Sequence, residues 1–445
     1  MQLAGPATVH GHPRQSYRED NKVRPGDRAA HDWYQFVLSF PPHLVREYLT
    51  RFGIKPGQIV LDPFCGTGTT LVECKKLGIE SVGIDPNPMA YLATTVKTDW
   101  TVSGLRLLSH AREVAELALT RLEAQGVDDF PTPPLFRIRR KSSPRLCGLP
   151  EETAGLLLSN SISPLPLHKT LTLLSAMDEL EDNRFTRHER LALAKALVSS
   201  ISNLEFGPEV GAGPAKADAP VVAPWLSYVE SIASDLRALH RHASTRTIVH
   251  RADARNPRAV LKPGSVDAVV TSPPYPNEKE YTRTTRLESV MLGFIRDKHD
   301  LRMLKKSLVR SNTRNVYKGD SDDAAVAGNA EVQRIAAMIE RRREELGKTS
   351  GFERLYARVT KLYFGGMTRH LSELREILRP GARLAYVVGD QASYLRVMIR
   401  TGHLLAEIAA SLGYEVIAVD LFRTRLATAT REQLREEVLV LRWPG

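Results

Sequence analysis

Two short stretches, far apart in the chain, hold the residue types that could do chemistry. Asp62-Pro63-Phe64-Cys65-Gly66-Thr67-Gly68-Thr69-Thr70 follows a short apolar run and contains a glycine turn. Thr271-Ser272-Pro273-Pro274-Tyr275 ends a second apolar run in a corner that carries an aromatic ring. Two prolines fix φ in that corner and hold it in one conformation. We expect the first stretch to bind a cofactor and the second to act on a substrate, in one common cleft.

The glycine turn restricts the class of cofactor. Gly66 and Gly68 would let the backbone approach a bound molecule closely. No lysine follows Gly68, where a triphosphate site needs the sequence Gly-Lys-Ser/Thr. Position 71 is leucine, so the three-glycine pattern of a dinucleotide site is incomplete. A cofactor without a pyrophosphate therefore fits this turn better than ATP or NAD.

Three acids follow three predicted strands. Asp62 ends the run 58–61, Asp85 ends the run 81–84, and Asp253 lies just beyond the run 247–250. The carboxyl ends of parallel strands are where open α/β sheets bind ligands, and an acid about 20 residues after the first turn commonly accepts ribose hydroxyl groups. A sulfonium methyl donor needs a close turn, an acid for its ribose and a polar partner for its adenine. Each acid alone could be a helix cap or a turn residue, but three in succession favour a binding site.

The proline corner suits methylation of an amino group on a nucleobase. The lone pair of such a nitrogen is delocalised into the ring, so acceptors aimed at its protons favour the tetrahedral form that attacks. The Ser272 side chain and the Pro273 carbonyl could be those acceptors, held in place by Pro274. Tyr275 could stack on a base flipped out of the duplex. The alternative is a proline turn with a tyrosine that only packs.

Methylation at carbon 5 of cytosine is set aside, because it needs a thiolate that adds to the ring. Cys65 lies in the glycine turn, Cys74 in the helix predicted after it, and Cys147 in a later segment. The three cysteines form no metal or disulfide pattern, which favours a reducing cytoplasm. The histidines show no metal-ligand spacing.

The charge balance favours a polyanionic partner. The 445 residues carry a formal net charge of +11, and neutralising phosphates releases counterions. There is no long uncharged apolar run and no signal-like start, so the sequence gives little support for a membrane or secreted protein.

The residues we select for DNA contact are basic. They are Arg139 and Arg140 in one cluster, Arg283 after the proline corner, and Lys305, Lys306 and Arg310 in the stretch 296–318, which has eight Lys or Arg against two Asp. Solvated helix faces explain any single one of them equally well.

Alternating strands and helices predict an α/β protein with a doubly wound, mostly parallel sheet and an antiparallel pair at its edge. Between about 100 and 245 the alternation stops; we expect helices, a loop over 207–224 and no convincing strand. Residues 319–330, small and acidic, are expected to be mobile, and the helix over 352–378 to be interrupted by Gly365-Gly366. The predicted division is a flexible arm (1–30), three catalytic parts (31–99, 246–295 and 351–445), a helical insertion that could read the target (100–245) and a basic, partly mobile insertion (296–350).

These motifs resemble those of the DNA amino-methyltransferases, the family that methylates cytosine N4 or adenine N6. The glycine turn resembles their S-adenosylmethionine motif, and Ser272-Pro273-Pro274-Tyr275 their catalytic motif. Phe40-Pro41-Pro42 is similar to the segment beside the methionine end of the cofactor, and Tyr281-Thr282-Arg283 also resembles this group. The resemblance implies a Rossmann-like class I sheet and a set of cofactor-binding residues: Pro41, Asp62, Phe64, Cys65, Gly66, Gly68, Thr69, Asp85 and Asp253.

The resemblance covers about half of the chain, and a serine first in the catalytic motif is commoner with cytosine N4 than with adenine N6. Here the cofactor motif comes first, whereas many enzymes with this catalytic motif have the reverse order, so target recognition does not transfer. We expect a site-specific methyltransferase of duplex DNA that uses S-adenosylmethionine, acts beside the nucleoid of a prokaryote and could serve restriction–modification with a cognate endonuclease. Adenine N6 methylation, RNA amino-methylation and a non-catalytic nucleic-acid-binding scaffold remain alternatives.

Overall fold

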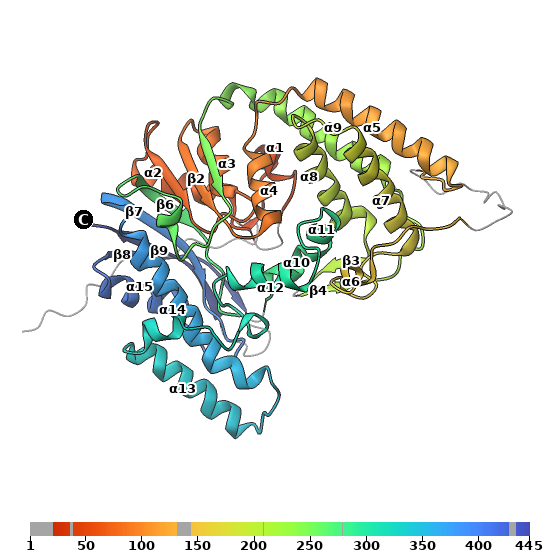
Figure 1. Cartoon of the computed structure of the whole chain (residues 1–445). Coiled ribbons are helices and arrows are strands. Elements are labelled where there is room, and N and C mark those ends of the chain that lie inside the picture. The colour runs from red at the N-terminus through yellow and green to blue at the C-terminus, as the bar shows by residue number, and fades with distance from the viewer. Residues whose placement is uncertain (1–20, 36–38, 131–143, 208, 278, 427–432) are drawn as a thin grey trace, which may run out of the picture.

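A seven-stranded sheet forms the centre of the molecule (Figure 1). The computed structural model describes residues 21–35, 39–130, 144–207, 209–277, 279–426 and 433–445. The strand order is β5-β2-β1-β6-β7-β9-β8; β9 pairs antiparallel with both β7 and β8, and the other neighbouring strands pair in parallel. This confirms the predicted doubly wound, mostly parallel sheet with an antiparallel edge pair. The strands are β1 (Ile59–Asp62), β2 (Glu80–Ile84), β5 (Thr247–His250), β6 (Val266–Thr271), β7 (Leu378–Gly389), β8 (Glu415–Leu426) and β9 (Gln433–Arg442).

Helices cover both faces of this sheet, because alternate residues of the central strands point to opposite sides. Val60 and Ala268 pack with the apolar residues of α2 on one face. Leu61 and Val269 pack on the other face, with α14 and α15. The helices around the sheet are α1 (Arg28–His31), α2 (Pro42–Phe52), α3 (Thr69–Lys76), α4 (Pro88–Lys97), α13 (Ala330–Glu345), α14 (Tyr356–Leu374) and α15 (Thr401–Ser411).

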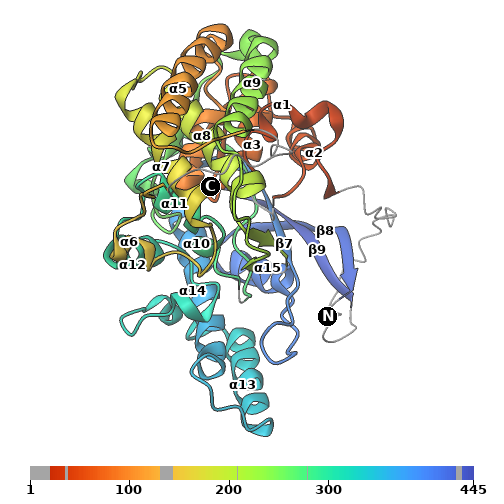
Figure 2. The ribbon, with the colours of Figure 1, turned by 90° about the vertical axis from the view of Figure 1, so that its right-hand side faces the viewer.

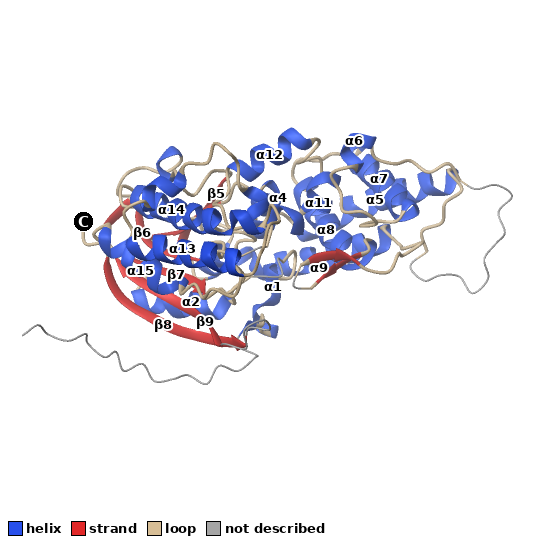
Figure 3. Ribbon diagram, turned by 90° about the horizontal axis from the view of Figure 1, so that it is seen from below, coloured by secondary structure: helices blue, strands red, loops and turns tan. Residues whose placement is uncertain are grey.

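The described residues of 100–245 form a helical unit, whose large apolar core includes Trp225 and is shared with α1 and α4 of the sheet domain. In Figure 3 this unit lies on the opposite side of the molecule from β8 and β9. Trp33, before α2, donates a hydrogen bond from Nε1 to Asp235 Oδ2 at 2.7 Å and so ties this unit to the N-terminal part of the sheet domain. Its helices are α5 (Gly104–Ala124), α6 (Glu151–Ala154), α7 (Pro164–Glu179), α8 (Thr186–Ala196) and α9 (Val222–Leu239).

A short antiparallel pair lies inside this helical unit, so the expectation of no strand there was wrong. β3 (Leu204–Phe206), just before the segment expected to be a loop, pairs with β4 (Val210–Ala212) inside that segment. Strands of three residues are too short for polar and apolar residues to alternate visibly. The pair places Glu209, in its connection, at the cavity described below.

The segment after the proline corner continues as α10 (Tyr281–Thr284), α11 (Arg286–Met291) and α12 (Lys298–Lys306). The segment 319–330, expected to be mobile, instead contains the 3-10 helix η7 (Asp322–Val326), whose Asp322 is buried between the guanidinium groups of Arg255 and Arg369. Figure 2 shows α13 and α14 extending away from the helical unit.

The expected interruption of α14 at Gly365-Gly366 was wrong, because the helix runs through both residues. A Cβ at Gly365 would lie 1.9 Å from the carbonyl oxygen of Asp322. The glycine there allows η7 to approach the helix backbone; it does not break the helix.

Across the described part of the chain, no helix combines the length and the apolarity needed to span a bilayer.

Candidate active site

The two motif loops meet because their strands are neighbours. β1 and β6 pair in parallel, with Val60 opposite Ala268, so both strands end at the same edge of the sheet. Thr271 Oγ1 donates to Asp62 Oδ1 at 2.6 Å, and Thr70 Oγ1 donates to the Val270 carbonyl at 3.0 Å. These bonds join the end of β6 to the end of β1 and to the first turn of α3, from which the two loops start.

A cavity of about 550 Å³ opens at this edge, and both loops line it. Its walls include Gly66 from the glycine turn and Tyr275 from the proline corner. Ligand sites of drug-sized molecules have volumes of this order. The juxtaposition that the two motifs require is therefore present.

The glycine turn adopts a backbone that favours glycine. Gly66 has φ of 50° and Gly68 has φ of 84°, both in the left-handed region. A Cβ at Gly68 would also lie 2.8 Å from Cγ2 of Thr94. Thr94 Oγ1 donates to the Gly66 carbonyl at 2.7 Å, so α4 holds the turn in place.

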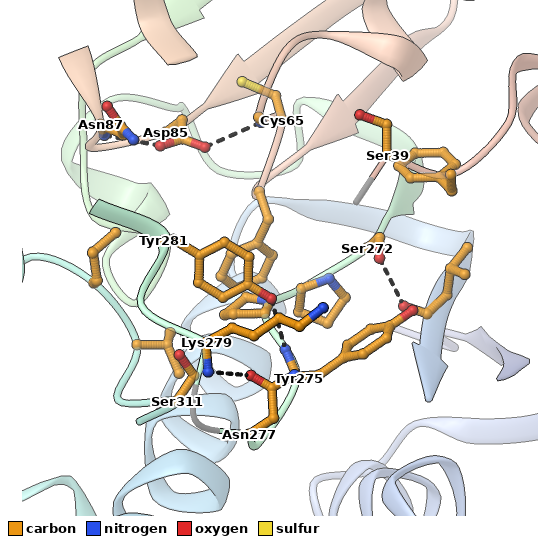
Figure 4. A pocket seen from close by; sticks show the side chains of 18 of the residues that line it. Ser39, Cys65, Asp85, Asn87, Ser272, Tyr275, Asn277, Lys279, Tyr281 and Ser311 are labelled. Carbon is orange, nitrogen blue, oxygen red and sulfur yellow. Dashed lines mark hydrogen bonds between the residues drawn. The ribbon is translucent and has the colours of Figure 1, made fainter. Parts of the chain in front are cut away.

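Asp85 faces the cavity and shapes the turn at the same time. Its carboxylate accepts from the Gly66 N–H at 3.0 Å and from the Asn87 N–H at 2.8 Å (Figure 4). Burial raises the pKa of Asp85 to about 6. The side chain that caps α4 is that of Asn87, which accepts from the Met89 N–H. Asp85 lines the cavity beside this cap, as an acceptor for a ligand hydroxyl must.

The other two acids hold the scaffold. Asp62 is fully buried, accepts from Thr271 and the Phe64 N–H, and is not among the residues that line the cavity. Burial raises the pKa of Asp62 to about 7. Asp253 lines the cavity, but both its oxygens accept from Arg255, with Nη2 to Oδ2 at 2.6 Å.

The remaining residues predicted to bind the cofactor divide into two groups. Phe64, Cys65 and Thr69 line the cavity. Pro41 and Gly68 do not, although Phe40, next to Pro41, does. Cys65 is buried, and burial raises the pKa of its thiol well above the ordinary value, so the neutral thiol is the stable form.

The proline corner is held by hydrogen bonds on both sides. Ser272 Oγ donates to the Val387 carbonyl of β7 at 3.1 Å (Figure 4), and the Tyr275 hydroxyl lies close enough to Ser272 to be influenced by it. The Tyr275 ring packs so closely on Gly389 that a Cβ there would lie 2.9 Å from the ring. The Tyr275 N–H donates to the Tyr281 hydroxyl at 3.4 Å. Burial and the Glu436 carboxylate raise the pKa of Tyr275.

Several polar residues line the cavity that no motif had indicated. They come from the loop after Tyr275, the connection between β3 and β4, the segment after α12 and the edge strands: Glu209, Asn277, Lys279, Ser311, Asn315, Arg423, Arg425 and Glu436. Asn277 and Lys279 follow Tyr275 so closely that proximity to the motif could have indicated them. The others lie more than 30 residues from either motif.

The residues selected for DNA contact have different surroundings. Arg139 and Arg140 lie outside the described residues. Arg283 is partly exposed, 3.7 Å from Glu209, and Lys306 is exposed. Lys305 pairs with Glu280 at 2.7 Å. The Arg310 side chain is only 3% exposed, and its guanidinium donates to Asp320 and to backbone carbonyls, so its hydrogen-bonding capacity is used inside the protein.

Comparison with known proteins agrees with this geometry. Residues 10–95 match the family model described as DNA methylase. The type II methyltransferase M.BsoBI of Geobacillus stearothermophilus is 27% identical over 439 residues, covering 91% of this chain and 82% of that protein. The type II methyltransferase M.AvaI of Anabaena variabilis is 23% identical over 461 residues, covering 95% of this chain and 88% of that protein. These similarities support an S-adenosylmethionine-dependent methyltransferase of the DNA amino-methyltransferase kind.

Among solved structures, TrmN of Thermus thermophilus aligns with a TM-score of 0.32 and 13% identity, covering 95% of this chain and 54% of that chain. DNA amino-methyltransferases of type II use S-adenosylmethionine, whose sulfonium supplies an electrophilic methyl group. The cavity of this methyltransferase suits that cofactor. It combines a glycine turn without a phosphate-binding lysine, the carboxylate of Asp85 and apolar walls that include Phe64 and Val309.

Proposed function

We propose that this methyltransferase modifies the exocyclic N4 amino group of cytosine at specific sites in duplex DNA, with the target base flipped into the cavity. The observation that carries the proposal is the hydrogen bonding of Ser272. A hydroxyl group has one proton, and that of Ser272 is donated to Val387. The Ser272 oxygen is therefore left as an acceptor at the cavity, on the loop that borders the cofactor turn.

In this proposal the amino protons of the base are accepted by the Ser272 oxygen and the Pro273 carbonyl. These acceptors favour the tetrahedral nitrogen and are held before the reaction begins, which avoids reorganisation in the transition state. Tyr275 stacks on the flipped base and offsets the cost of unpairing, a few kcal/mol. Tyr281, through the Tyr275 N–H, positions this loop.

The cofactor-binding residues are proposed as a set with different tasks. Asp85 accepts from the ribose hydroxyl groups, and Gly66 allows close approach of the backbone. Asp253 is proposed to face the adenine. Both its oxygens already accept hydrogen bonds from Arg255, so adenine binding would require Asp253 to accept a second hydrogen bond or the Arg255 side chain to move. Those that line the cavity or support its walls are Pro41, Asp62, Phe64, Cys65, Gly68 and Thr69.

Cytosine N4 is favoured over adenine N6 because serine is the first residue of the catalytic motif. Both bases present an amino group to the same acceptors, so the two chemistries share every residue named above. The relatives carry the name type II methyltransferase, and we extend this to a role in restriction–modification, with a cognate endonuclease as partner.

The decisive experiment combines sequencing and product analysis. Host DNA with and without this protein is sequenced by a method that reports modified bases, and the purified enzyme then methylates a duplex that contains the site found. Digestion to nucleosides should yield N4-methylcytosine. N6-methyladenine would overturn the choice of base, methylation of RNA alone would overturn the substrate, and binding of the methyl donor without any product would indicate a non-catalytic scaffold.

A further inference from the structure

The backbone of Lys279 is fixed at the edge of the cavity. Its N–H donates to Asn277 Oδ1 at 2.9 Å, and its carbonyl accepts from Asn312 Nδ2 at 3.1 Å. Asn312 is itself fully buried. A residue anchored on both sides in this way presents its side chain from a defined point, unlike a lysine in a free loop.

The side chain of Lys279 extends into the cavity between Tyr281 and Tyr275 (Figure 4). Within the described part of the chain, no acceptor receives a hydrogen bond from its ammonium group, although the Glu209 and Glu436 carboxylates and the Arg425 guanidinium act on it from a distance. Burial and Arg425 lower the pKa of Lys279. By contrast, Lys305 nearby pairs with Glu280 at 2.7 Å.

An ammonium group that is partly removed from water without an acceptor is unfavourable, so its placement calls for a ligand that accepts hydrogen bonds. On cytosine, the amino group is followed along the same edge by the ring nitrogen N3 and the carbonyl oxygen O2, which are both acceptors. Ser272 and Pro273 are acceptors and can serve only the amino group. The rest of that edge requires a donor, and Lys279 is a donor only.

Resting on the proposed function, we propose that Lys279 reads the target base by donating to the N3 and O2 edge of the flipped cytosine. Adenine also has a ring nitrogen acceptor, N1, beside its amino group, but it has no carbonyl group there, so the contact to O2 would discriminate against adenine. A lysine can also bind a DNA phosphate, and the experiment must separate a contact to the base from a contact to the backbone.

The test compares wild type, Lys279→Met and Lys279→Arg in single-turnover methylation of the duplex that contains the modification site. Lys262→Met, at an exposed lysine outside the cavity, is the control variant. A second duplex carries an analogue of the target base that keeps the amino group and the ring nitrogen but has hydrogen in place of O2. Binding of S-adenosylmethionine, measured by calorimetry, reports whether each variant is folded.

We expect wild type to lose about tenfold to hundredfold in rate on the analogue, the effect of one charge-assisted hydrogen bond. On the cytosine duplex, Lys279→Met should be slower than wild type by a similar factor, and Lys279→Arg should recover part of the rate. On the analogue duplex, where O2 is already absent, Lys279→Met should be little slower than wild type. Equal losses by Lys279→Met on both duplexes, or a reduced salt dependence of DNA binding, would overturn the proposal in favour of a phosphate contact. Wild-type loss on the analogue tests the contact even if the variants do not fold. If wild type yields no N4-methylcytosine from the normal duplex, the proposed function has failed instead.

Discussion

Ser272 Oγ donates a hydrogen bond to the carbonyl oxygen of Val387 at 3.1 Å. Ser272 follows β6, and Val387 lies in β7, so this bond joins the proline corner to the neighbouring strand. A backbone carbonyl in the middle of a sheet hardly moves. The orientation of the hydroxyl group is therefore set by the sheet and not by the loop alone.

Replacing Ser272 should separate catalysis from cofactor binding. Ser272→Ala removes one of the two proposed acceptors, and we expect methyl transfer to fall by about 100-fold or more, as for the loss of a preorganised polar group in other active sites. Binding of S-adenosylmethionine, measured by calorimetry, should be unchanged. Ser265→Ala, just before the other end of β6, is the matched control and should keep full activity. Turnover of Ser272→Ala at the wild-type rate would refute the role of this side chain.

Cofactor binding should weaken in acid through Asp85. The pKa of this carboxyl group is raised to about 6, so it is ionised above that pH and protonated below it. The carboxylate of Asp85 accepts hydrogen bonds from ribose hydroxyl groups better than the protonated acid does. The Kd for S-adenosylmethionine should therefore rise below about pH 6, by at most about tenfold per pH unit. Asp85→Asn should bind about tenfold to hundredfold more weakly, without this pH dependence. The control Asp178→Asn, in the helical unit, should follow wild type, and a pH-dependent Asp85→Asn variant would contradict the assignment.

The two adjacent glycines of α14 should respond differently to alanine. A Cβ at Gly365 meets the Asp322 backbone at 1.9 Å, which no side-chain motion relieves, so Gly365→Ala should lower the free energy of unfolding by about 3 kcal/mol or more. At Gly366 the nearest atom is a methyl group of Val309 at 3.3 Å. There the gain in helix propensity offsets the crowding, and Gly366→Ala should change stability by less than about 1 kcal/mol. Urea unfolding measures both, and equal effects would refute the close approach of η7.

Two basic residues of the 296–318 stretch should affect DNA binding in different ways. Lys306 is exposed, and Lys306→Ala should reduce the slope of log K against log salt concentration by about 1 if it contacts a phosphate. Arg310 is buried with Asp320, so Arg310→Ala leaves a carboxylate without its partner and should destabilise the fold by about 3 to 5 kcal/mol, with the salt slope of the folded fraction unchanged. DNA titrations at several salt concentrations and urea unfolding separate the two effects. A lowered slope for Arg310→Ala would contradict its internal role.

Much of the fold could be predicted because buried parallel strands are short apolar runs that end in turn or acidic residues. Residues 58–61, 81–84 and 247–250 have this form, and the strands lie there within one residue. The sequence also predicted that Tyr275 and the glycine turn lie side by side, since both loops come after neighbouring strands of one sheet.

The remainder depends on contacts that are distant in the sequence. Gly365-Gly366 is typical of a break, and only the packing of η7 explains why the helix continues. A count of charges cannot tell that Arg310 is paired with Asp320 while Lys306 is free of such a buried partner. Lys279 is one lysine in a polar loop, and its importance emerges only from the cavity that the other elements enclose.

The place of β9 affects how the sheet is assembled during synthesis. β9 follows β8 in the chain but lies between β7 and β8. As the polypeptide leaves the ribosome, β8 therefore emerges with no strand to pair with, and the edge of β7 stays open. Both must wait for residues 433–442 before the sheet can close, and a nascent chain stalled before that point would expose two long strands to aggregation or to chaperones.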